Sequence, residues 1–362
     1  MIEATAVRAE LLALLRRHRL RQRMLIFAGL ALLILAALAS TGLGVETLPI
    51  GKTLRALLAP LLPPEDVADI TQTQILVLQQ LRLPRTVMAM IGGAGLSLAG
   101  VAMQGITRNP LVSPYTLGIS PAAAFGASLA ILFGLANLPG TGPYWTVGAA
   151  FLSAILCAGL VLGFSALRGV SSITLILGGV GLTYLFGAAT ATVQFVATEQ
   201  QLAAIVHWTF GTINGSTWQE VRIAGAILLM GFPVLMGHAW ALNAFAAGGD
   251  EIAASLGFAV ARTRILVTMV AVLIAAGIVS FTGVIGFVGL VAPHIARFLV
   301  GGDHRTLLPF SAITGALLLL VADMIGRLAF APVIIPVGII VAYVGVPIFL
   351  HLLLARREEL SA

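Results

Sequence analysis

Charged side chains are scarce, making up only 9% of the 362 residues, whereas hydrophobic residues make up 59%. So few charges cannot keep a chain of this composition dissolved as an ordinary globular protein. Cysteine is almost absent as well: the single Cys157 excludes an intrachain disulfide and a cysteine metal cluster. The composition therefore indicates a polytopic integral membrane protein.

Catalytic motifs are also missing. The sequence contains no His-Glu-x-x-His, no paired cysteines and no Gly-x-Ser-x-Gly. Gly51-Lys52-Thr53 resembles the end of a phosphate-binding loop, but the glycine required five residues before Gly51 is replaced by Glu46. We therefore expect no catalytic residues, no metal ligands and no enzymatic activity in this chain.

Ten long apolar segments are present. A bilayer core about 30 Å thick needs roughly 20 apolar residues per helix, and these runs lack the alternation of a barrel strand. The predicted fold class is therefore all-α, with about ten transmembrane helices. The expected spans are Met24–Leu43, Thr86–Gln104, Tyr115–Leu135, Trp145–Leu167, Ile173–Val196, Arg222–Trp240, Ile265–Phe281, Val284–Val300, Leu307–Arg327 and Ile335–Leu354.

Basic residues set the expected orientation, because arginine and lysine in short loops stay on the cytoplasmic side. Five arginines between residues 16 and 23 precede the first span, and ten spans return the C-terminus to the same side. We predict a basic cytoplasmic segment (1–23), a transmembrane domain (24–354) and a cytoplasmic tail (355–362). The net charge of +6 is explained by topology and membrane lipid rather than by nucleic acid.

Carboxylates inside the predicted spans are rare. Asp323 is the one well inside a span, and Arg327 follows one helical turn later on the same face, so the two can pair. Ion-driven transporters usually carry several such groups as relays. The energy source for any transport is therefore expected outside the membrane segments.

Several motifs, taken together and in order, are similar to those of the FecCD permease family. They are Leu83-Pro84-Arg85, Gly100, Gln104, Arg108-Asn109-Pro110-Leu111, Pro114, Leu117-Gly118-Ile119, the GFVGLVAPHIAR run ending at Arg297, and Ile335-Pro336-Val337-Gly338. The resemblance covers residues 24 to 354. It implies the permease subunit of an ABC importer of the type II architecture, in the cytoplasmic (inner) membrane. It also implies a dimeric pore, two cytoplasmic ATPase subunits that bind ATP and magnesium, and an extracytoplasmic substrate-binding protein; no cofactor is expected on this chain.

The loop between the sixth and seventh spans is the predicted ATPase-coupling site. Asp250 can cap a short helix, Glu251 suits its positive N-terminus, and Gly257 can end it. Ile252 and Leu256 lie four residues apart and form an apolar knob for a groove on another protein. The alternative is an interfacial helix lying on lipid.

The fifth span carries the predicted translocation path. Thr183, Gly187, Thr190 and Gln194 recur at helical spacing and form one stripe, which must face protein or water. The resemblance favours lining of the path; close packing against another helix is the alternative. Ser171 and Ser172, at the cytoplasmic start of this span, are the predicted inner gate.

Basic residues on the outward side are the predicted contacts for the binding protein, as the resemblance implies. We select Lys52, Arg55 and Arg327, with solvated surface charge as the alternative. The sequence departs from the family pattern at Ile334, where the family usually has an acidic residue. An apolar side chain at this position cannot make the contacts of a carboxylate, so no such contact is carried over to Ile334.

The transported substrate is not fixed by the sequence. The resemblance implies a metal chelate, with iron-siderophore the most common case and haem or cobalamin as alternatives. Symmetry favours a homodimer, although a paralogous partner is equally compatible with the motifs. A stand-alone secondary transporter driven by an ion gradient is the alternative function.

Overall fold

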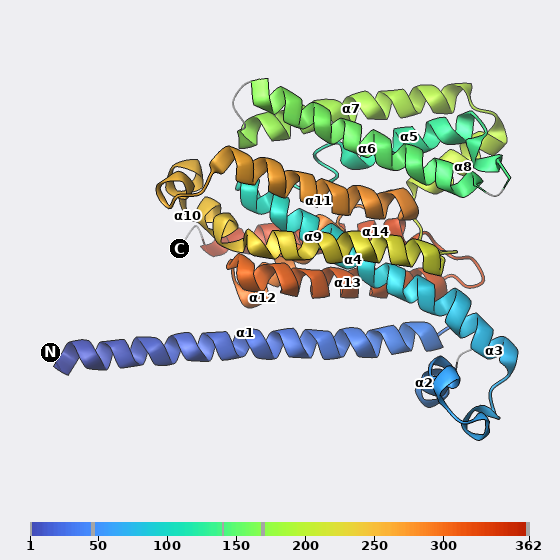
Figure 1. Ribbon diagram of the computed structural model, residues 1–362, viewed down its shortest axis with the longest axis horizontal. Helices are drawn as coiled ribbons and strands as arrows, with labels where there is room; N and C mark the ends of the chain where they lie inside the picture. The colour runs from blue at the N-terminus through green and yellow to red at the C-terminus, as the bar shows by residue number, and fades with distance from the viewer. Residues whose placement is uncertain (1, 45–47, 140, 168–170, 360–362) are drawn as a thin grey trace.

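The computed structural model describes residues 2–44, 48–139, 141–167 and 171–359, and within these ranges the chain is helical with no strand. A helix occupies each of the ten predicted spans, which confirms the all-α class (Figure 1). In chain order these helices are α1 (Ile2–Gly42), α4 (Leu83–Thr107), α5 (Ile119–Leu132), α6 (Gly142–Leu167), α7 (Ser172–Val196), α9 (Trp218–Gly237), α11 (Val260–Thr282), α12 (Val288–Val300), α13 (His304–Leu328) and α14 (Val337–Glu359).

Seven of these helices are long and apolar enough to cross a membrane, and α5, α12 and the first part of α14 are shorter apolar helices. The long apolar helices make this a multi-pass membrane protein. Helix α4 lies at its centre and packs against α9, α11, α12 and α13.

Close packing around α4 depends on glycine. A methyl group on Gly93 would lie 2.1 Å from the carbonyl oxygen of Gly315 in α13, and one on Gly100 would lie 1.8 Å from that of Gly289 in α12. Glycine is therefore required for helix contact at Gly93 and Gly100. At Gly286, by contrast, no atom lies within 4 Å of the corresponding position.

Several helix boundaries differ from the prediction. Residues 2–23 of the predicted basic segment are continuous with the first span in α1, and the predicted C-terminal tail continues α14 to Glu359; residues 1 and 360–362 lie outside the described residues. Helix α12 begins at Val288, four residues late, because Phe287 takes a left-handed conformation (φ 62°). Helix α5 begins after Gly118 for the same reason (φ 79°).

Shorter helices gather at the two ends of the bundle. Helix α10 (Ala239–Ser255) lies at the end that also holds both chain termini, and α2 (Ile50–Leu57), α3 (Gln72–Leu76) and α8 (Glu199–Thr209) lie at the opposite end (Figure 1). A π-helical stretch, Val77–Arg82, joins α3 to α4, and 3-10 turns occupy Ala59–Leu61, Pro64–Val67 and Leu135–Asn137. Helix α8 was not predicted, because eleven residues are too few for a span.

Candidate functional site

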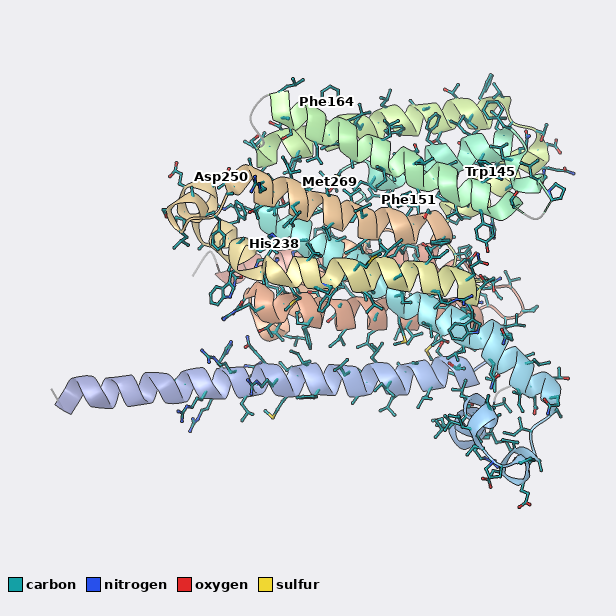
Figure 2. All side chains as sticks on the ribbon, viewed as in Figure 1. Trp145, Phe151, Phe164, His238, Asp250 and Met269 are labelled. Carbon is teal, nitrogen blue, oxygen red and sulfur yellow. The ribbon has the colours of Figure 1, made fainter. Side chains whose placement is uncertain are left out.

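The predicted coupling helix is the second half of α10. Its backbone breaks at Gly248 and Gly249, so Asp250–Ser255 forms a separate short helix. Gly249 has φ +79°, and a methyl group there would lie 2.7 Å from the Arg108 guanidinium. The helix ends before Gly257, whose φ of +87° is typical of a C-terminal glycine. Figure 2 shows Asp250 at the end of the molecule opposite Trp145.

The predicted apolar knob is exposed. Ile252 is 41% exposed and Leu256 is 63% exposed, whereas Ala253 is buried against Phe245. The short helix therefore has one anchored face and one free apolar face. This geometry suits both predicted partners, an ATPase groove and a lipid surface, so the assignment stays a prediction.

Asp250 forms an ion pair with Arg264 at the start of α11, a contact that the sequence analysis did not predict. The Arg264 Nη2 and Nη1 atoms donate to the carboxylate at 2.5 and 3.1 Å. Arg264 is 1% exposed and lies 5.5 Å from the centre of the Phe245 ring. Arg264 therefore joins the short helix to the body of the molecule, a role that the sequence analysis missed.

A backbone carbonyl connects this pair to the predicted inner gate. The Ile106 oxygen, near the end of α4, accepts a hydrogen bond from Ser172 Oγ at 3.2 Å and from Arg264 Nη2 at 3.5 Å. Ser171 caps α7, accepting from the backbone N–H of Thr174. Both serines therefore hold the start of α7, and Ser172 attaches it to the carbonyl that Arg264 also contacts.

The predicted stripe on α7 runs beside the buried face of that helix. Thr190 is buried, Thr183 and Gln194 are half-buried, and Gly187 is exposed. The hydroxyls of Thr183 and Thr190 donate to carbonyls within α7, those of Gly179 and Phe186. The stripe thus lies between the face packed on α5 and α6 and an exposed apolar face, and its role in the path stays a prediction.

At the opposite end of the bundle, Asp323 is buried between two arginines. The predicted ion pair with Arg327 is confirmed at 3.1 Å, and Arg85 adds hydrogen bonds at 2.8 and 3.0 Å. Arg327 also donates to the side chain and carbonyl of Ser40 in α1 and is only 10% exposed. If Arg327 contacts the binding protein, it must do so while bonded to Asp323 and Ser40.

Lys52 and Arg55 lie on α2 and share Asp69. The distances from their nitrogens to the Asp69 carboxylate are 3.1 and 3.0 Å, and both basic side chains are more than a third exposed. The Arg55 guanidinium, followed by the Lys52 ammonium, lowers the pKa of the Asp69 carboxyl below its usual value. Both predicted docking residues are therefore accessible and already paired within the chain.

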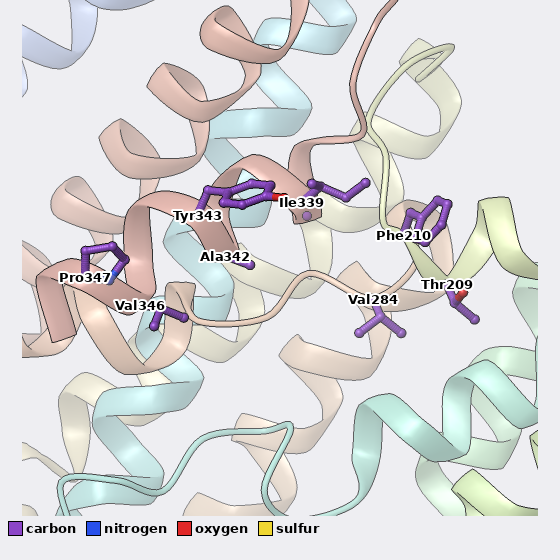
Figure 3. A pocket seen from close by; sticks show the side chains of 9 residues that line it. Thr209, Phe210, Val284, Ile339, Ala342, Tyr343, Val346 and Pro347 are labelled. Atoms are coloured by element: carbon purple, nitrogen blue, oxygen red, sulfur yellow. The ribbon is translucent and has the colours of Figure 1, made fainter. Parts of the chain in front are cut away.

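An open groove of ≈ 630 Å³ lies beside the start of α14 (Figure 3), and the sequence analysis did not predict it. Ile339 and Tyr343 of α14 lie on one side, and Phe210 and Val284 lie on the other. Gly338 permits this arrangement, because a methyl group there would lie 2.2 Å from the Phe210 carbonyl oxygen. The Ile-Pro-Val-Gly motif could have located it, since a glycine at a helix start allows close backbone contact.

Comparison with known proteins gives a consistent assignment. The profile of the FecCD transport family matches residues 32–355. An ABC transporter permease of Methanocaldococcus jannaschii is 44% identical, with 78% of this chain and 83% of that protein covered. The cobalamin import permease of Halobacterium salinarum is 39% identical, with 81% and 77% covered.

A solved structure supports the same fold. It is described as an inward-facing conformation of a transporter assigned to the metal-chelate ABC type, and it superposes with a TM-score of 0.80 at 33% identity. The match covers 92% of this chain and 99% of the solved one. The helical architecture described above is therefore shared with that solved chain.

Proposed function

Because the chain belongs to the FecCD transport family, we propose that it is the permease subunit of an ABC importer that carries a metal chelate across the cytoplasmic membrane. One observation carries the proposal: Asp250–Ser255 presents Ile252 and Leu256 to solvent while Arg264 anchors its other side. A helix with a free apolar face and a rigid attachment suits the transmission of movement from another protein.

Movement would enter through this short helix. Two cytoplasmic ATPase subunits, which bind ATP and magnesium, would contact it in a homodimer of this chain. Since Asp250 is joined to Arg264, and Arg264 to the Ile106 carbonyl that also holds Ser172, a displacement of the helix reaches the starts of α11 and α7 together. Alternating access requires such differential contacts in two states.

The substrate would pass beside α7 and along the groove of α14. The groove is mostly apolar and open, which suits a large neutral or weakly charged chelate that is not held tightly. An iron-siderophore is our first choice, with cobalamin or haem as alternatives. Selectivity would then rest with the extracytoplasmic binding protein that delivers the substrate.

Reconstitution tests this function directly. We expect uptake of a ferric siderophore into proteoliposomes only when the ATPase, ATP and the binding protein are all present. Replacing Ile252 and Leu256 by aspartate should abolish co-purification of the ATPase, whereas the Ala254→Asp control, on an exposed residue between them, should weaken it less. Uptake driven by this chain alone would refute the proposal.

The secondary-transporter alternative is not favoured by the site. Asp323, the buried carboxylate of α13, is neutralised by Arg85 and Arg327. Because both arginines already pair with this carboxylate, it lacks the open coordination that a relay for a coupling ion requires. The external energy source of an ABC importer agrees better with this arrangement.

A further inference from the structure

A small pocket between α1 and the start of α13 is not used by the proposed transport cycle. It has a volume of ≈ 280 Å³ and is lined by Arg19, Gln22, Arg23 and Ile26 of α1, together with Asp303, Arg305 and Thr306. We propose that this pocket, called here the α1–α13 pocket, binds the phosphodiester headgroup of an anionic phospholipid in the leaflet that faces the chain termini.

The charge of the pocket favours an anion. Three arginines face one carboxylate, and Asp303 already accepts hydrogen bonds from Arg305 (3.0 Å) and from Asn243 Nδ2 (2.8 Å). Within the described part of the chain, no carboxylate pairs with Arg19 or Arg23. Two guanidinium groups, four residues apart on one helix face, are therefore available for a phosphate, which arginine binds well.

The pocket lies at the level of the membrane where lipid headgroups are found. Arg23 is the last charged residue of α1, and the residues after it expose apolar side chains, including Met24 (57%) and Phe27 (71%). Trp240 is 60% exposed at the same end, and the Arg305 guanidinium lies 4.1 Å from its ring centre. Exposed tryptophan and the end of an apolar helix surface both mark the membrane interface.

The walls of the pocket suit a lipid better than a free solute. Ile26 lines the side toward the apolar part of α1, where an acyl chain would lie. The volume is below the roughly 300–1,000 Å³ of typical small-molecule sites, which fits a headgroup alone. Gln22 Nε2 donates to the Val300 carbonyl at 2.7 Å, so α1 is fixed to the end of α12 beside the pocket.

One hydrogen bond also connects the pocket to α10. Asn243 donates to Asp303 and accepts from the backbone N–H of His304 at 2.8 Å. A phosphodiester held by Arg19, Arg23 and Arg305 would join α1 to α13 next to this contact. Lipid binding would therefore stabilise the end of the bundle from which the coupling helix extends.

Native mass spectrometry of the full chain in detergent, titrated with phosphatidylglycerol, tests the proposal. The Arg19→Gln/Arg23→Gln variant should bind it about thirty-fold more weakly, given the usual contribution of each basic side chain near anionic lipid. The matched control is Arg17→Gln/Arg21→Gln, which removes the same charge at the same spacing from the opposite face of α1. It should change the affinity less than threefold.

Three results would overturn the proposal. If both double variants lose phosphatidylglycerol affinity equally, the attraction is a general one to the basic surface of α1. If the wild type binds phosphatidylcholine as tightly as phosphatidylglycerol, or if equimolar inorganic phosphate displaces the lipid, the pocket does not select an anionic lipid headgroup. Should the Arg19/Arg23 variant fold poorly, Arg305→Gln removes the third arginine from a different helix. That variant must also lose phosphatidylglycerol binding, by about fivefold for one charge, and wild-type binding in it would count against the pocket.

Discussion

Arg264 is the residue on which the coupling mechanism depends most. It is buried, yet its partner Asp250 is 51% exposed, so removing the cation leaves a carboxylate that water can solvate. We expect Arg264→Met to assemble with the ATPase and to retain ATP hydrolysis, while substrate uptake falls about tenfold, within the usual range for coupling between sites. Parallel assays of ATP hydrolysis and uptake in proteoliposomes measure this separation.

The control for that variant is Arg262→Met, two residues earlier on α11. Arg262 is exposed and carries the same charge, so its loss should leave hydrolysis and uptake unchanged. If Arg264→Met lowers both activities in proportion, the residue supports assembly rather than transmission of movement, and the proposed connection through Ile106 is wrong.

Asp323 is expected to be a stability residue rather than a transport residue. Its replacement by asparagine would leave Arg85 and Arg327 facing each other in a buried site without a counter-charge. Breaking a buried pair in this way costs about 3–5 kcal/mol of unfolding free energy. Thermal unfolding in detergent should show a large fall in Tm.

The exposed pair around Asp69 provides the comparison. Asp69→Asn breaks ion pairs that water already screens, so Tm should barely change. Equal effects of the two substitutions would mean that the network around Asp323 contributes no more than a surface ion pair.

At the scale of helices, hydropathy was sufficient to locate a helix in each of the ten predicted spans, although α5, α12 and the apolar part of α14 are shorter than a full span. It could not place α8, which is too short for a span. It also could not place the break at Gly248 and Gly249, because Gly249 lies against Arg108 from a distant part of the chain. The ion pair of Asp323 with Arg327 was predictable from helical spacing. The contribution of Arg85, 238 residues away, was not.

The groove of α14 depends on one close contact between elements. We expect Gly338→Ala to push the first turn of α14 away from the Phe210 carbonyl, because the added methyl group has no room. Such overpacking typically costs about 1–3 kcal/mol, and uptake should fall with it. Gly163→Ala in α6 is the control, since no atom lies within 4 Å of its position and alanine favours a helix. A wild-type Tm and uptake rate for Gly338→Ala would show that the contact is dispensable.

Over the whole molecule, the two ends have different chemistry. The end with the chain termini and α10 carries the arginines of the α1–α13 pocket and the exposed coupling helix, whereas the other end carries α2 and its basic pair. Exposed charges of this kind act mainly on the rate at which a partner associates. We therefore predict that Lys52 and Arg55 affect the association rate of the binding protein more than its affinity.

We expect Arg55→Glu to slow association with the binding protein about tenfold at low salt, because it lowers the charge of α2 from +2 to zero. The difference should vanish near 1 M salt, where charges are screened beyond about 3 Å. Surface plasmon resonance across a salt series measures both effects. The exchange variant Arg55→Asp/Asp69→Arg keeps the ion pair and the net charge of α2 and its neighbours, so its association rate should approach that of the wild type. If Arg55→Glu associates at the wild-type rate at low salt, α2 does not attract the binding protein.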